Sequence, residues 1–229
     1  MEAINDLEDL LVHHLQSLYA AEDLILQAMP SVIKKANHKS LKNALQHHLD
    51  LTNEQKKRLE QIIPLLHQKN AEASEHLSIK NGSSKGMLGL IEEANEIVEK
   101  ELATEVIDAA IISCVQKIEH YEICAYGTAL AFAKQLHLHK VEQLLKETLD
   151  EEYDADDLLT ALATASYNKE AAPEGLEDEQ TANASDEDSS GTKSSRDGKV
   201  SITERTINSP GGRAGTSHRG YSTGESRGH

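Results

Sequence analysis

The chain has 229 residues, a formal net charge of −16 at pH 7, one phenylalanine and no tryptophan. The acidic balance excludes nucleic acid as a main partner of a folded domain, because binding to a polyanion depends on basic residues. No apolar run approaches the ~20 residues that cross a membrane, and the scarcity of aromatic residues predicts a core of Leu, Ile, Val and Ala.

Composition changes sharply near residue 170. Residues 1–168 are rich in Leu, Ala, Ile, Glu and His and are long enough to fold alone. Residues 169–229 are dominated by Ser, Gly, Asp, Glu, Thr and Arg. This polar segment cannot bury enough apolar surface to offset the entropy lost on folding. We therefore predict a helical domain over 1–168 and a disordered, low-complexity tail over 169–229.

Apolar residues recur at intervals of three and four along five segments, which predicts five helices and no strand. The predicted helices cover residues 3–37, 39–70, 86–99, 104–135 and 139–167. Pro30 and Pro64 are expected to bend the first two helices, and Thr104 is expected to cap the fourth. Asn81 to Ser84 form a strong loop signal.

The connection between the second and fourth predicted helices is unusually long and contains the short third helix. One long crossover between two helix pairs is typical of ferritin-like proteins rather than of a simple up-down bundle. The sequence therefore predicts an all-α, ferritin-like four-helix bundle with a short extra helix in the crossover over residues 71–103.

Glutamate replaces an aliphatic residue on the inward face of three predicted helices. The positions are Glu22 in the first helix, Glu119 and Glu122 in the fourth, and Glu151 in the last. An unpartnered buried carboxylate costs several kcal/mol, so packing alone rarely explains one. Carboxylates that converge from several helices are typical ligands of a pair of metal ions.

Two pairs of acidic residues in the last predicted helix are alternative candidates for the site. Glu151 and Asp154 lie three residues apart, which places both on one face of the helix, and we take them as candidate ligands. Glu152 and Asp156 form the competing pair, and we expect this pair to face solvent.

The second helix is the weak part of the predicted site. Its inward positions hold His48, Thr52 and Gln55, none of which is a carboxylate. His48 could bind a metal through its neutral imidazole. Asp50 and Asn53 have a suitable spacing but lie off the apolar stripe. The alternative interpretation is that all these polar positions form a wet interface or a subunit contact.

Tyr126 and the two cysteines bear on the site and on the redox state of the protein. Tyr126 on the fourth helix either packs in the core or donates a hydrogen bond to a ligand carboxylate. Cys114 and Cys124 are ten residues apart on the same helix, about 15 Å, which is too far for a disulfide. With no secretory signal before the first helix, we expect a cytoplasmic protein with reduced thiols.

Three parts of the sequence form recognisable motifs, at Gly89–Glu96, at Gln116–Ile123 with Tyr126–Thr128, and at Leu144–Glu152. These motifs resemble those of the YciE/YciF family of bacterial ferritin-like stress proteins. The resemblance implies a rubrerythrin-like bundle, a homodimer and a di-iron-type centre with Glu119, Glu122 and Glu151 among its ligands. The chain departs from the rubrerythrin pattern at Thr52, Gln55 and Asp154, which puts full occupancy by two metals in doubt.

Two functions follow from these observations. The first is a stress protein with a dinuclear iron or manganese site that reacts with peroxide or dioxygen. The alternative is a non-enzymatic, dimeric scaffold with a vestigial metal site. The family has no firmly assigned reaction, so the resemblance implies the fold more strongly than the activity.

Overall fold

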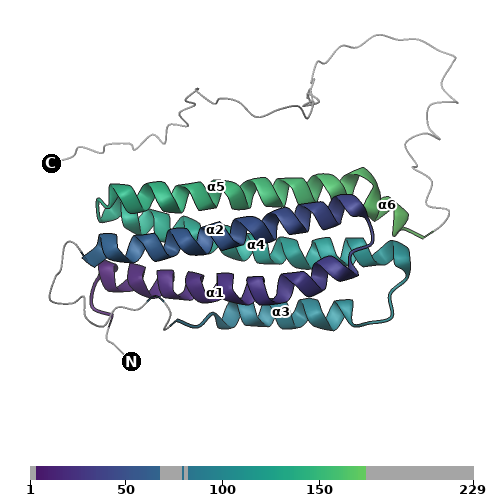
Figure 1. Ribbon diagram of the computed structural model, residues 1–229, viewed down its shortest axis with the longest axis horizontal. Helices are drawn as coiled ribbons and strands as arrows, with labels where there is room; N and C mark the ends of the chain where they lie inside the picture. The colour runs from purple at the N-terminus through teal and green to yellow at the C-terminus, as the bar shows by residue number, and fades with distance from the viewer. Residues whose placement is uncertain (1–3, 68–78, 80–81, 174–229) are drawn as a thin grey trace, which may run out of the picture. The chain divides into compact units, whose positions relative to one another are not determined.

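The computed structural model describes residues 4–67, 79 and 82–173, and Figure 1 shows their arrangement. The elements are α1 (Leu7–Lys35), α2 (Lys39–His67), α3 (Lys85–Val98), α4 (Thr104–Gln135), α5 (His139–Leu162), a π-helical turn (Ala163–Tyr167) and α6 (Asn168–Glu170). The described residues contain no strand. The all-α prediction is therefore confirmed for this part of the chain.

Four long helices form a closed ring in which each packs on two others. Helix α1 contacts α2 and α4, and α5 contacts the same two helices from the opposite side. Within the pairs α1/α2 and α4/α5 the helices run antiparallel (Figure 1). Helix α3 lies in the crossover and covers the groove between α1 and α4. This is the predicted ferritin-like topology.

The observed helix ends lie close to the predicted ones. Asp6 caps α1 by accepting hydrogen bonds from the backbone N–H groups of Glu8 and Asp9, both at 2.9 Å. Thr104 is the first residue of α4 rather than its cap, a position that Ala103 occupies without a side-chain hydrogen bond. Both prolines lie inside continuous helices.

Helical structure continues to Glu170, two residues past the predicted boundary at 168. The predicted tail from residue 174 onward and most of the first part of the predicted crossover, between residues 71 and 84, lie outside the described residues.

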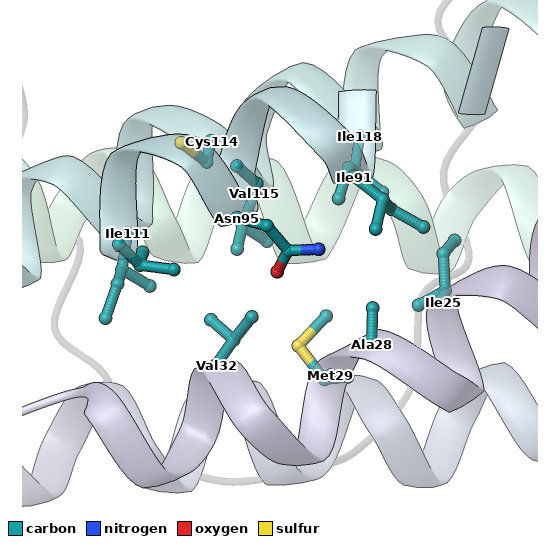
Figure 2. Close-up of a pocket in the computed structure, with 12 residues that line it drawn as sticks. Ile25, Ala28, Met29, Val32, Ile91, Asn95, Ile111, Cys114, Val115 and Ile118 are labelled. Atoms are coloured by element: carbon teal, nitrogen blue, oxygen red, sulfur yellow. The ribbon is translucent and has the colours of Figure 1, made fainter. Parts of the chain in front are cut away.

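Two apolar clusters fill the bundle on either side of its middle. One includes Ile25, Leu45, Val115 and Leu159, and the other includes Leu18, Leu59, Tyr126 and Leu145. Where α3 covers α1 and α4, the first cluster leaves a cavity of about 20 Å³ whose lining is almost wholly apolar (Figure 2). A cavity of this size has room for about one water molecule. The middle of the bundle, between the clusters, is polar.

Asp108 of α4 holds the connection between α1 and α2. Its carboxylate accepts hydrogen bonds from the backbone N–H groups of Asn37 (2.6 Å) and His38 (2.7 Å), just before α2 begins. The His38 ring also lies 2.5 Å from Asp108 through Nδ1, and it stacks on Tyr167. A buried aspartate on the inward face of a helix is thus explained by capping of a neighbouring helix.

We expect Asp108→Asn to lower the free energy of unfolding by about 1–3 kcal/mol, because an amide offers one acceptor where the carboxylate offers two. For a chain of this size the melting temperature should fall by roughly 3–10 °C. Glu105→Gln, an exposed change in the first turn of the same helix, is the matched control. Equal melting temperatures for the two variants would contradict the capping role.

A Schellman motif closes the turn between α4 and α5. The backbone N–H of Leu138 donates to the carbonyl of Ala133 (3.0 Å) and that of His137 donates to Lys134 (3.1 Å). His137 adopts a left-handed conformation with φ of 56°, at the position where glycine is most common. The motif joins α4 and α5 by a connection of three residues.

Candidate metal centre

Four glutamates from three helices meet in the polar middle of the bundle. They are Glu22 on α1, Glu119 and Glu122 on α4, and Glu152 on α5, and each is 0% exposed. In sequence, each lies between residues of the two apolar clusters, as Glu22 does between Leu18 and Ile25. The apolar clusters therefore shield the carboxylates from solvent at both ends.

Helix α2 supplies the fourth side of the site with polar but neutral groups. His48, Thr52 and Gln55 are all buried, as the apolar periodicity predicted. Thr52 donates its hydroxyl to the backbone carbonyl of His48 (2.9 Å), and Gln55 donates its amide to Glu152 (2.5 Å). The alternative candidates Asp50 and Asn53 are exposed and do not reach the site.

Nine buried side-chain atoms in this region lack a hydrogen-bond partner. They belong to Glu22, His48, Gln55, Glu119, Glu122 and Glu152, and include both carboxylate oxygens of Glu119 and of Glu122. Among the residues that the structure describes, no other buried side-chain nitrogen or oxygen is left without a partner. Buried polar groups are nearly always satisfied, so a concentration of this kind makes the cluster a candidate ligand site.

One subset of these groups has the geometry of a metal site. His48, Glu119 and Glu122 each offer a ligand atom, and the three atoms lie within 4.8 Å of one another. Imidazole nitrogen and carboxylate oxygen together suit transition-metal ions such as iron and manganese. The donor set therefore fits a divalent ion at this position.

Burial changes the protonation of every acid in the cluster. It raises the pKa values of Glu22, Glu119 and Glu122 well above the usual value, and the neighbouring glutamates raise them further. Burial also raises the pKa of Glu152, to about 7. Without a cation, the cluster is most stable when several of its carboxyl groups are neutral.

His48 and Glu119 lie 3.4 Å apart, between Nδ1 and Oε1, a distance that would suit an ion pair. Burial, however, lowers the pKa of His48 to about 4 and raises that of Glu119, so both shifts act against an ion pair. We therefore take the pair as neutral. A neutral imidazole is the form that binds metal ions.

Tyr126 donates a hydrogen bond from its hydroxyl to Oε1 of Glu22, and both side chains are completely buried. Of the two roles left open by the sequence, the structure shows the hydrogen bond to a carboxylate of the cluster. The bond fixes one oxygen of Glu22 and leaves Oε2 without a partner. Tyr126 thus orients a candidate ligand, as groups around metal sites commonly do.

The predicted assignment on α5 is wrong by one residue. Glu152 is buried and Glu151 lies at the edge, where its side chain is 21% exposed and Arg58 holds it through two hydrogen bonds of 2.6 Å. Asp154 is exposed and does not join the cluster. The expectation that Glu152 faces solvent is therefore overturned, while the structure brings Glu22, His48, Glu119 and Glu122 together as predicted.

The one-residue error has a clear origin in the sequence. The inward face of α5 runs through Val141, Leu145, Thr148, Glu152 and Leu159. Leucine and glutamate are doubled at 144–145, 151–152 and 158–159, so either member of each pair satisfies a helical period. Periodicity alone could not choose between them. The partner that separates them, Arg58, lies on another helix.

An all-α bundle with carboxylates from three helices in its middle belongs to the class of ferritin-like proteins. Residues 6–172 match the domain of unknown function DUF892. The chain is a member of this family, which is the YciE/YciF family indicated by the sequence motifs.

The relatives include protein YciF of Escherichia coli, which is 40% identical over 165 residues, covering 72% of this chain and 95% of YciF. The crystal structure of that E. coli protein, described as a stress protein, matches with a TM-score of 0.66 and 38% identity over 72% of this chain and 99% of the other.

YcfI from Rhodopseudomonas palustris, described as a candidate structural protein, matches with a TM-score of 0.62 and 34% identity over 69% of this chain and 96% of the other. No helix in the described part of the chain has both the length and the apolarity needed to cross a membrane.

The raised pKa values predict how the stability of metal-free protein depends on pH. A carboxyl group with a higher pKa in the folded chain stabilises the fold below its unfolded pKa, and this effect is lost as pH rises through the folded pKa. The melting temperature of chelator-treated protein should therefore rise as pH falls from 8 to 5.5. The lowered pKa of His48 has the opposite effect, because it destabilises the folded chain as pH falls below ~6.5. This is one group against the four glutamates.

Glu122→Gln tests this dependence. Removing one buried carboxylate should raise the melting temperature at pH 8 by roughly 2–4 °C, about 1 kcal/mol, and flatten the pH profile. The control is Glu92→Gln on the exposed face of α3. If the two variants have the same pH profile, the Glu122 carboxylate is not a source of the dependence.

Proposed function

We propose that this chain is a ferritin-like stress protein that holds iron or manganese in the carboxylate cluster. The supporting observation is the set of nine buried, unsatisfied polar atoms, all of which belong to side chains of the cluster. A bound cation would accept the lone pairs of these atoms. It would also remove the repulsion that raises the pKa values of the glutamates.

The charges of the cluster suit two divalent ions. Four ionised glutamates carry four negative charges, and the four side chains of α2 and α4 nearest to them, His48, Thr52, Gln55 and Tyr126, are neutral. The nearest cation, Arg58, is already paired with Glu151 and Glu147. Two divalent ions would balance the four carboxylates, which makes burial of the whole group far less costly.

The two ions would not be held equally. His48, Glu119 and Glu122 would hold the first, since their ligand atoms already converge. The second would depend on Glu22 and Glu152, with only the amide oxygen of Gln55 on the α2 side. An amide is a weaker ligand than a carboxylate or imidazole, so we propose that the second ion binds more weakly.

Iron or manganese bound there would supply electrons to a small oxidant such as peroxide or dioxygen. The protein's own part is to exclude water with the two apolar clusters and to orient Glu22 through Tyr126. We also propose the homodimer that the family resemblance implies. The competing proposal is a scaffold with a vestigial site, for which the neutral residues of α2 are the supporting observation.

Metal loading separates the two proposals. Chelator-treated protein, incubated anaerobically with Fe(II) or Mn(II) and desalted, should retain at least one ion per chain by elemental analysis. Glu119→Gln should retain less than half of that amount, because it removes a charged ligand of the better-formed position. Glu105→Gln, on the exposed surface of the same helix, should retain the full amount. Metal-free wild-type protein after loading would favour the scaffold.

Restoring ligands on α2 should strengthen the second position. Thr52 and Gln55 are buried beside the cluster, so Thr52→Glu combined with Gln55→His should raise the stoichiometry towards two ions per chain. The extra carboxylate should also lower the melting temperature of the metal-free variant. An unchanged stoichiometry in a correctly folded double variant, judged by circular dichroism, would show that α2 does not limit the site.

A further inference from the structure

A cavity of about 270 Å³ opens between α2 and α5 and reaches the carboxylate cluster. Its inner end is formed by His48 and Glu119, which are 5% and 0% exposed, together with Val115. Its outer end is formed by His47, Asp154 and Leu158, which are exposed. The cavity therefore leads from the surface of the bundle to two of the candidate ligands.

The groups at the inner end lack partners. Neither ring nitrogen of His48 and neither carboxylate oxygen of Glu119 makes a hydrogen bond. These atoms are the unsatisfied polar groups at the buried end of the cavity.

The charge of the lining favours cations over anions. Among the described residues, the cavity is lined by the acids Glu119, Glu151 and Asp154 and by no lysine or arginine. Glu151 is neutralised by Arg58, and no basic side chain is paired with Asp154 in the described structure. The exposed carboxylate at the mouth is therefore that of Asp154, which would concentrate cations there.

The size of the cavity suits a hydrated ion. On the measure by which about 20 Å³ has room for one water molecule, six waters need roughly 60–90 Å³, so an ion with its first hydration shell fits within 270 Å³. Along the axis of the bundle, by contrast, the two apolar clusters close both sides of the site. A cation moving along the axis would have to cross close-packed aliphatic side chains, which is far more costly than a polar route.

We propose that the cavity between α2 and α5 is the route by which divalent metal ions reach the buried cluster, with Asp154 attracting the ion and His48 and Glu119 receiving it. This inference rests on the proposed metal-binding function. It gives Asp154 a role outside the ligand set. It also requires that substitutions in the cavity change the rate of loading and leave the final amount of bound metal unchanged.

The experiment follows cobalt(II) binding to full-length, chelator-treated protein by stopped-flow absorbance. Asp154→Asn should slow loading by roughly threefold or more at low ionic strength, and the difference should shrink at high salt, where attraction between charges is screened. Asp157→Asn, an exposed aspartate on the same helix that does not line the cavity, is the control and should load at the wild-type rate.

A steric variant tests the route independently of charge. Ala155→Phe fills the cavity from α5 and should slow loading by about tenfold with unchanged final stoichiometry, whereas Ala161→Phe, on the exposed surface of α5, should have no effect. If both cavity variants load at the wild-type rate and to the wild-type amount, the route is overturned and metal binding stands. If the wild-type chain binds no cobalt, iron or manganese, both the proposed function and the route are overturned.

Discussion

Burial of four carboxyl groups from three helices is the constraint on which the rest of this structure depends. Glu22, Glu119, Glu122 and Glu152 are completely inaccessible to solvent, and most of their oxygens have no hydrogen-bond donor. Such an arrangement lowers stability, and the two aliphatic clusters that flank it must offset the loss. A protein without a ligand for these groups would be more stable with leucine or glutamine in their place.

Helix α2 shows how the free-energy cost of burying these carboxyl groups is limited. Its buried positions carry an imidazole, a hydroxyl and an amide, all neutral, and the amide of Gln55 donates to Glu152. One turn further along, Arg58 binds Glu151 and keeps that carboxylate at the edge of the bundle. Helix α2 thus donates a hydrogen bond to Glu152 and holds a fifth acidic residue, Glu151, away from the centre of the bundle. The same choice of residues makes the site asymmetric, with its convergent donors on the side of His48.

Much of this architecture could be predicted from the sequence, because aliphatic periodicity over long segments is a strong signal. It located all five helices and the crossover, and it identified the inward faces of α1, α2 and α4, including His48, Thr52 and Gln55. The error on α5 arose at Glu151 and Glu152, two adjacent residues that both fit the helical period. That ambiguity is resolved only by contacts between helices, above all the pairing of Glu151 with Arg58. The capping role of Asp108 was equally hidden, because its partners lie some 70 residues away.

The turn between α4 and α5 acts together with the Arg58–Glu151 pair in placing one of the two neighbouring glutamates in the core. Its three residues are held by the Schellman hydrogen bonds and by the left-handed conformation of His137, so α5 begins at a fixed rotation relative to α4. If α5 kept its starting point in space, each residue added to or removed from this turn would shift the helix register by one residue, which is about 100° around its axis. During divergence of the family, insertions or deletions in this turn should therefore be far rarer than in the long crossover, because a single one would exchange the buried acid for a neighbour that faces solvent.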